Sequence, residues 1–72
     1  MNIQKQQKTL TTGIVERVDQ EEGFNYEFAS VTKTDVDGAF SSISLKVEGI
    51  QIDFKNREDA LETANLLLAV LA

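Results

Sequence analysis

The chain contains neither cysteine nor histidine. These two absences exclude disulfide bonds, zinc and haem sites built from these ligands, and catalysis by a cysteine or histidine side chain. We therefore expect the protein to hold no metal ion and no cofactor. The lack of cysteine also fits the reducing environment of the cytoplasm.

Basic residues and long apolar runs are scarce as well. Seven Lys and Arg stand against twelve Asp and Glu, which gives a formal net charge of −5. Nucleic-acid phosphate repels such an acidic surface, so we expect no nucleic-acid binding and a partner that carries a basic patch. No run approaches the roughly 18 apolar residues of a membrane helix, and the N-terminus lacks the apolar core of a signal peptide. These features predict a cytoplasmic protein that does not bind membranes.

The length of 72 residues leaves room for one domain with one small core. A chain of this size buries only roughly 60% of the surface that its unfolded form exposes. Small domains usually add disulfides, a metal ion or association with another chain to reach a stable fold. Because the first two are excluded, we expect a homo-oligomer.

The clearest pattern runs from Ile43 to Phe54, around Glu48-Gly49. A two-residue loop with glycine second suits a tight hairpin turn, and directly opposed residues of a hairpin share a face. One register sorts the stretch into an apolar and a polar face, and a slip of one residue would mix them. The apolar pairs are Val47 with Ile50, Leu45 with Ile52, and Ile43 with Phe54. The polar pairs are Lys46 with Gln51, Ser44 with Asp53, and Ser42 with Lys55.

Turn residues and alternation extend this hairpin to a four-stranded meander. Asp37-Gly38 is a strong hairpin signal, and Gly23 closes a further loop. We expect strands over residues 10–19, 24–34, 39–47 and 50–55 and a helix over residues 57–71. Residues 1–9 are polar and are expected to form a mobile N-terminal segment. The predicted fold class is α+β, a four-stranded antiparallel β-meander with one C-terminal α-helix packed on one face of the sheet.

The sequence determines the pairing register of the first two strands less well than that of the other two. Gly13 suggests a bulge or the point where pairing begins. A loop over residues 19–23 would oppose Val18 to Phe24 and Ile14 to Phe28. The alternation then changes phase at Ala29, which indicates either a bulge near residues 28–30 or a strand covered on both faces. We expect the aromatic residues of this strand to pack beneath the helix; they are Phe24, Tyr26 and Phe28.

The predicted helix begins after Asn56, whose side chain can accept the backbone N–H of Asp59. One face carries the apolar residues expected to lie on the sheet, which are Ala60, Leu61, Ala64, Leu67, Leu68 and Leu71. Leu66, Ala69 and Val70 lie off this stripe. Either sheet curvature and the N-terminal segment cover them, or they form a subunit interface. We favour the interface and take these three residues as candidates for self-association.

Patterns that suggest enzyme chemistry are incomplete. The Asp35-Val36-Asp37-Gly38 stretch resembles part of a calcium loop, but Lys33 and Ser44 occupy two essential ligand positions. The paired acids at residues 21–22 and 58–59 are expected to be solvated, and no histidine is present to activate the serines. The sequence therefore predicts that the protein is not an enzyme.

Two surfaces are candidates for contact with a partner protein. The first combines the acidic loop of Glu21 and Glu22 with Phe40, which would oppose Asp35 on the outer, polar face if Asp37-Gly38 is a two-residue turn. The second is the polar face of the hairpin, which is either plain solvent cover or a recognition surface. Its charged residues are Lys46, Asp53 and Lys55.

In length and acidity the chain resembles the small accessory proteins of phages and mobile elements that inhibit a host protein. The resemblance implies that the protein binds and inhibits a host protein. From this, together with the small size and the incomplete enzyme motifs, we predict a small acidic protein-binding module, without enzymatic activity, that forms homo-oligomers. The alternative is a protein that binds a small ligand or nucleotide at a site formed between subunits.

Overall fold

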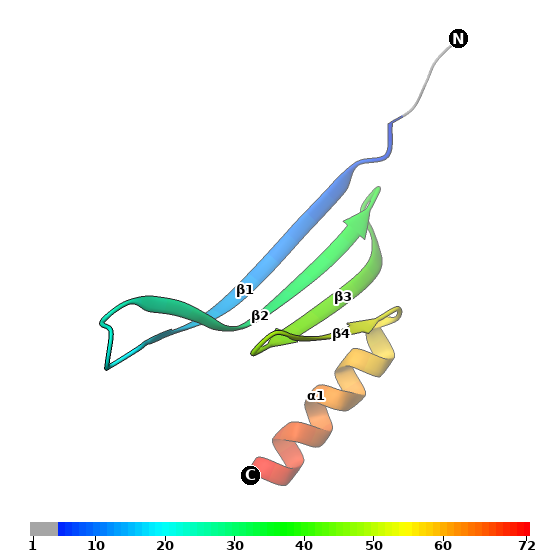
Figure 1. Cartoon of the computed structure of the whole chain (residues 1–72). Coiled ribbons are helices and arrows are strands. Elements are labelled where there is room, and N and C mark those ends of the chain that lie inside the picture. Colours follow the sequence, from blue (N-terminus) through cyan, green and yellow to red (C-terminus); the bar gives the residue numbers. More distant parts are fainter. Residues whose placement is uncertain (1–4) are drawn as a thin grey trace.

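The computed structural model describes residues 5–72, which form one antiparallel sheet and one helix (Figure 1). The strands follow the order β1-β2-β3-β4, so each strand pairs with its neighbour in the chain. The elements are β1 (Lys8–Val18), β2 (Asn25–Val36), β3 (Ala39–Val47), β4 (Ile50–Phe54) and α1 (Arg57–Leu71). α1 contacts β3 and β4, which confirms the predicted meander with a C-terminal helix on one face. Of the predicted N-terminal segment, residues 1–4 lie outside the described residues, and Lys8 and Thr9 belong to β1.

Two tight turns set the register of β2, β3 and β4. Asp37 and Glu48 have positive φ angles of 51° and 50°, and each precedes a glycine with positive φ. Positive φ at both central residues is the conformation whose twist matches that of the flanking strands. The pairs Val47–Ile50, Leu45–Ile52 and Ile43–Phe54 form as predicted. Lys55 follows the last residue of β4 and lies outside the ladder.

A β-bulge interrupts the pairing of β1 with β2. Val15 pairs with Ala29 and Glu16 pairs with Glu27, so Phe28 is an extra residue in β2. The bulge therefore explains the phase change, and the alternative of a regular strand covered on both faces is wrong. An extra residue bends the strand and reverses the alternation beyond it.

The predicted pairing at the β1–β2 turn is wrong. Val18 pairs with Asn25 instead of Phe24, and Ile14 pairs with Ser30 instead of Phe28. The loop between the paired residues is therefore one residue longer than predicted. Its ends are joined by a hydrogen bond in which the Asp19 N–H donates to the Phe24 carbonyl at 2.8 Å, and this bond places Phe24 opposite Asp19 instead of Val18. Gly13 pairs regularly with Val31, so the predicted irregularity lies elsewhere.

α1 begins as predicted. Asn56 has an extended backbone, and its side-chain oxygen accepts the Asp59 N–H at 2.8 Å. The Asn56 amide also donates to the Asp59 carboxylate at 3.1 Å. Glu58 and Asp59 occupy the first turn, where the helix dipole favours negative charge.

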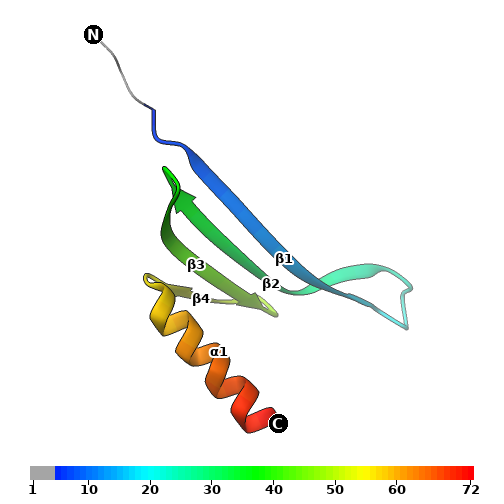
Figure 2. The same ribbon diagram turned by 180° about the vertical axis from the view of Figure 1, so that it is seen from behind.

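The sheet has a helix-side face, on which α1 lies, and an opposite outer face. α1 runs back from the end of β4 along β3 and β4, while the β1–β2 hairpin projects past it (Figure 2). Among residues 5–72, no side chain is buried. The radius of gyration is 16.2 Å, whereas a compact chain of this length has about 11 Å. The single chain thus leaves its core open.

Candidate interaction surfaces

The helix-side face over β1 and β2 is bare. α1 contacts only β3 and β4, and within residues 5–72 it reaches this half of the sheet only at its border, where Val31 lines the cleft beside Leu67. Phe24 is 47% and Tyr26 is 38% exposed, and the prediction that the aromatic strand packs beneath the helix is wrong. Both residues belong to the far part of the β1–β2 hairpin, and the turn of this hairpin projects past α1 (Figure 1). We call this region the bare half. Its glycine and apolar or aromatic residues are Gly13, Val15, Tyr26, Ala29 and Val31, and Thr11, Arg17 and Lys33 lie on the same face.

The side of α1 turned away from the sheet is also apolar. Leu66 and Val70, the candidates for self-association, are 65% and 75% exposed, and Leu68 and Leu71, which were expected to lie on the sheet, are equally open at 66% and 79%. Ala69 is exposed between them. From Ala64 to Ala72 the chain contains no charged residue, so the second half of α1 is apolar around most of its circumference.

An open cleft separates α1 from the sheet. Its volume is about 230 Å³, and its walls are almost wholly apolar. The lining side chains include Val31, Leu45 and Phe54 from the sheet and Ala60, Ala64 and Leu67 from α1. The small alanines allow the helix to approach β3 and β4, but the cleft shows that the two layers do not close over each other.

The outer face carries a polar row across all four strands. The register aligns Thr12, Thr32, Ser44 and Asp53. The hydroxyls of Thr12 and Thr32 are 3.1 Å apart and hydrogen bonded. Hydrogen bonds from the Ser44 hydroxyl and then the Gln51 amide hold the pKa of the Asp53 carboxyl below its ordinary value. Lys46, another candidate contact residue, pairs with Gln51 on the same face.

The edge strand β1 adds an apolar stripe to the outer face. Leu10, Ile14 and Val18 are each more than half exposed there and alternate with Thr12 and Glu16. The structure places Val15 on the helix-side face and these three residues on the outer one. Nothing in the described structure covers the stripe.

The acidic loop is held in shape by Asp19. The Asp19 carboxylate accepts the backbone N–H groups of Glu21 and Glu22 at 2.9 and 3.0 Å. Both glutamate side chains are exposed. Nearby, the Arg17 guanidinium lies 3.4 Å from the centre of the Phe28 ring, a cation–π contact that follows from the bulge at Phe28.

Phe40 does not lie where the sequence predicted. It pairs with Asp35 as expected, but a second register shift in β3 places it on the helix-side face. There it is half-buried and lines a shallow hollow with Arg57, Ala60 and Leu61. The acidic loop and Phe40 also lie at opposite ends of β2, so they do not form one patch.

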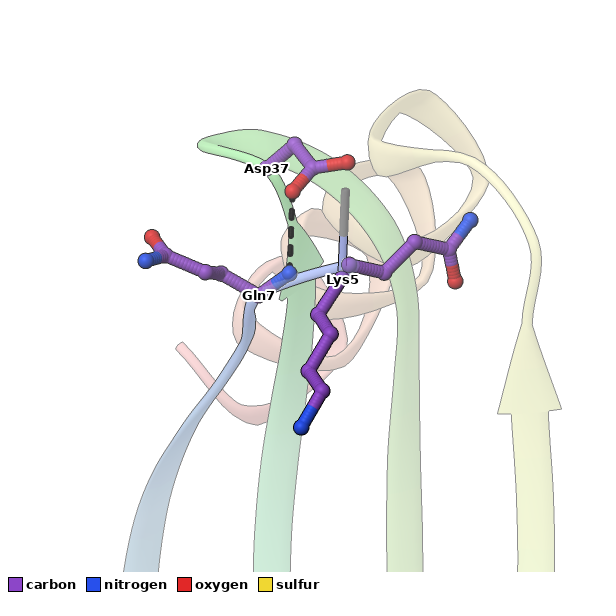
Figure 3. A pocket seen from close by; sticks show the side chains of 4 residues that line it. Lys5, Gln7 and Asp37 are labelled. Atoms are coloured by element: carbon purple, nitrogen blue, oxygen red, sulfur yellow. Dashed lines mark hydrogen bonds between the residues drawn. The ribbon is translucent and has the colours of Figure 1, made fainter. Parts of the chain in front are cut away.

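The β2–β3 turn fastens the start of the described chain. Gln7 N–H donates to the Asp37 carboxylate at 2.9 Å, and Asp37 N–H donates to the Gln7 carbonyl at 2.8 Å. Figure 3 shows the first of these bonds beside a polar hollow lined by Lys5, Gln6, Gln7 and Asp37. The hollow is open, and Asp37 is the one acidic residue among those that line it.

No three acidic side chains of residues 5–72 gather as metal ligands, and no helix there is long and apolar enough to cross a membrane. The features that stand out are the bare half, the outward side of α1 and the polar row. Comparison with protein-family models, with curated proteins and with solved structures gave no match for this chain.

Proposed function

We propose that the protein is a non-enzymatic binding module that self-associates and acts by binding a separate protein. The observation that carries this proposal is the open core of residues 5–72, in which no side chain is buried. A single chain of this kind gains little from hydrophobic burial, the dominant favourable contribution to folding. Extended apolar surface on a folded chain marks an interaction site. We expect this apolar surface to mediate self-association.

The separate partner would meet the surfaces that self-association leaves free. The net charge of −5 favours a basic patch on that partner. The polar outer face with Lys46 and Asp53, and the acidic loop of Glu21 and Glu22, are the candidates. The compositional resemblance to phage and mobile-element accessory proteins supports a host protein as the target and inhibition as the outcome.

Sedimentation velocity at micromolar concentration tests the first part. We expect a mass that is a multiple of the chain mass of 8.0 kDa. A monomer under these conditions would rule out self-association. Affinity capture tests the second part, with the wild type compared with Lys46→Glu and with Glu21→Lys/Glu22→Lys. Loss of one captured protein in one of these variants, with the oligomer intact, is the expected result.

A small apolar ligand is the second candidate, because the cleft between α1 and the sheet is lined almost wholly by apolar groups. This chemistry suits a hydrocarbon chain or ring better than a nucleotide. A thermal-shift comparison separates these classes, since a ligand at about 100 times its dissociation constant stabilises by roughly 2.7 kcal/mol. If fatty acids and nucleotides alike leave the melting temperature unchanged, the cleft is only an unfilled part of the core.

A further inference from the structure

The bare half has the width of one helix. Neighbouring strands lie about 4.8 Å apart, so β1 and β2 present roughly 10 Å of sheet. An α-helix with its side chains is about 10 Å across. α1 covers β3 and β4 alone, and therefore a second helix fits beside it on the same sheet.

The second half of α1 is apolar on more than one side, so its burial requires contacts beyond those with its own sheet. Residues 64–72 include one polar side chain, that of Asn65, and no charge. A helix that is apolar all round is normally buried all round. Its own sheet lies on one side only, and Leu66, Ala69 and Val70 are turned away from it. A second apolar layer would complete the burial.

The chain exposes more surface than a compact protein of its mass, and the excess is as large as the area that a subunit interface buries. The accessible surface is 6406 Å², whereas a compact protein of this mass exposes about 4,450 Å². The surface of the chain therefore exceeds that of a compact protein of this mass by about 1,950 Å². Obligate homodimers bury from about 1,000 Å² per chain upward. The excess therefore matches what one identical partner would bury.

We propose that a second copy of the chain fills the bare half with its own α1, around a two-fold axis parallel to the strands. This inference rests on the self-association proposed above and adds the arrangement. Such an axis turns the two helix-side faces toward each other and brings β1 and β2 of one copy opposite β3 and β4 of the other. Each helix then lies between its own β3–β4 and the partner's bare half. The contact is reciprocal and closed, so assembly stops at the dimer.

The direction of α1 fixes which residues meet. α1 runs from the end of β4 back toward the β3–β4 turn, so its second half lies toward that end of the sheet in both views (Figure 2). Val15 and Ala29 lie in the same cross-strand row as Val47 and Ile50, next to that turn. An axis parallel to the strands leaves positions along them unchanged. Val70 of one copy therefore meets Val15 of the other.

Cysteine cross-linking tests this contact directly, because the chain has no cysteine of its own. One sample carries Val15→Cys and a second carries Val70→Cys, and the two are mixed, refolded together and mildly oxidised. Any disulfide between them is intermolecular by design. We expect the mixed dimer to exceed either symmetric cross-linked dimer at least tenfold. Thr12→Cys, three residues away on the outer face, is the control and should cross-link to Val70→Cys no more than background.

Substitution at Gly13 gives an independent measurement. Nothing lies within 4 Å of a Cβ built at Gly13, and its φ is not in the left-handed region, so the single chain accommodates a side chain there. In the proposed dimer that position faces the second helix. We expect Gly13→Glu to weaken dimerisation at least tenfold, while Thr12→Glu on the outer face leaves the dissociation constant unchanged.

The outcomes separate the arrangement from self-association itself. A monomeric wild type would overturn both proposals. A dimer whose main cross-link joins Val15 to Val15, or Val70 to Val70, would overturn the arrangement and leave self-association standing. Equal effects of Gly13→Glu and Thr12→Glu would also overturn it, since only one of these residues lies on the helix-side face.

Discussion

Glu48 occupies a backbone conformation that suits asparagine better. Its φ of 50° is left-handed, and the side chain of an L-residue there costs about 1 kcal/mol relative to a residue that tolerates this region. Asn-Gly is the preferred pair for such a turn. We expect Glu48→Asn to raise the free energy of unfolding by about 0.5–1 kcal/mol, measured from urea denaturation with an unchanged slope.

Asp37 provides the control for Glu48. It has the same left-handed φ, but aspartate already tolerates it better than most residues. Asp37→Asn should therefore change stability little. A similar gain at both positions would show that removal of a negative charge, and not the turn conformation, is responsible.

Asp53 gives the outer face a pH dependence. Hydrogen bonds, first from Ser44 and then from Gln51, lower the pKa of this carboxyl in the folded chain. A lowered pKa stabilises the fold above the unfolded-state pKa, and this contribution is lost as the pH falls through the folded value. The stability difference between the wild type and Asp53→Asn should thus be largest near neutral pH and shrink below about pH 4.

Ser44→Ala tests the cause of this shift. Loss of the hydroxyl should move the pKa of the Asp53 carboxyl upward in an NMR titration of its carbon resonance. Gln51→Ala should have a smaller effect, since the Gln51 amide is the lesser cause. A larger effect at Gln51 would reverse this ranking.

At the scale of elements, the start of α1 is held by one residue. Asn56 satisfies the Asp59 N–H at 2.8 Å, and alanine at this position leaves that donor without its partner. We expect Asn56→Ala to lower the free energy of unfolding by about 1 kcal/mol, whereas Asn56→Asp retains most of it. Chemical denaturation and helix content by circular dichroism measure the effect. An unchanged stability in Asn56→Ala would mean that the first turn is not formed in solution.

The elements also show what the sequence can and cannot predict. Opposed apolar pairs and a Glu-Gly turn determined the β3–β4 register, because both faces of that hairpin are sorted by polarity. β1 is apolar on both faces, with Val15 on one and Ile14 on the other, so alternation alone did not choose its phase. The bulges at Phe28 and beside Phe40 had no glycine to mark them, and the second reversed the face of Phe40.

The candidate surfaces also differ in how far the sequence alone predicts them. The position of Leu66 and Val70 off the apolar stripe follows from helical periodicity, which depends on the local sequence alone. Their exposure does not, because Leu68 and Leu71 lie on the stripe and are equally exposed. The row from Thr12 to Asp53 depends on the register of all four strands at once. The bare half depends on where α1 sits across the sheet, and no local pattern specifies that position.

For the whole molecule, an open core makes stability depend on concentration. If dimerisation supplies the missing burial, unfolding and dissociation occur together and mass action favours the dimer at higher concentration. For two chains of 72 residues we expect the melting temperature to rise by about 5 °C for each tenfold increase in protein concentration. Calorimetry over two decades of concentration measures this rise, and a constant melting temperature would contradict it.

The nearest-neighbour order of the strands has a consequence for the time course of folding. Every pairing joins segments adjacent in the chain, so the sheet forms without closing long loops and should assemble within milliseconds. In the proposed dimer, burial of the outward side of α1 then waits for an encounter between two chains, and its rate depends on diffusion and protein concentration. Refolding followed by stopped-flow fluorescence of Tyr26 should accordingly show an early phase independent of concentration and a later, second-order phase that carries most of the stabilisation.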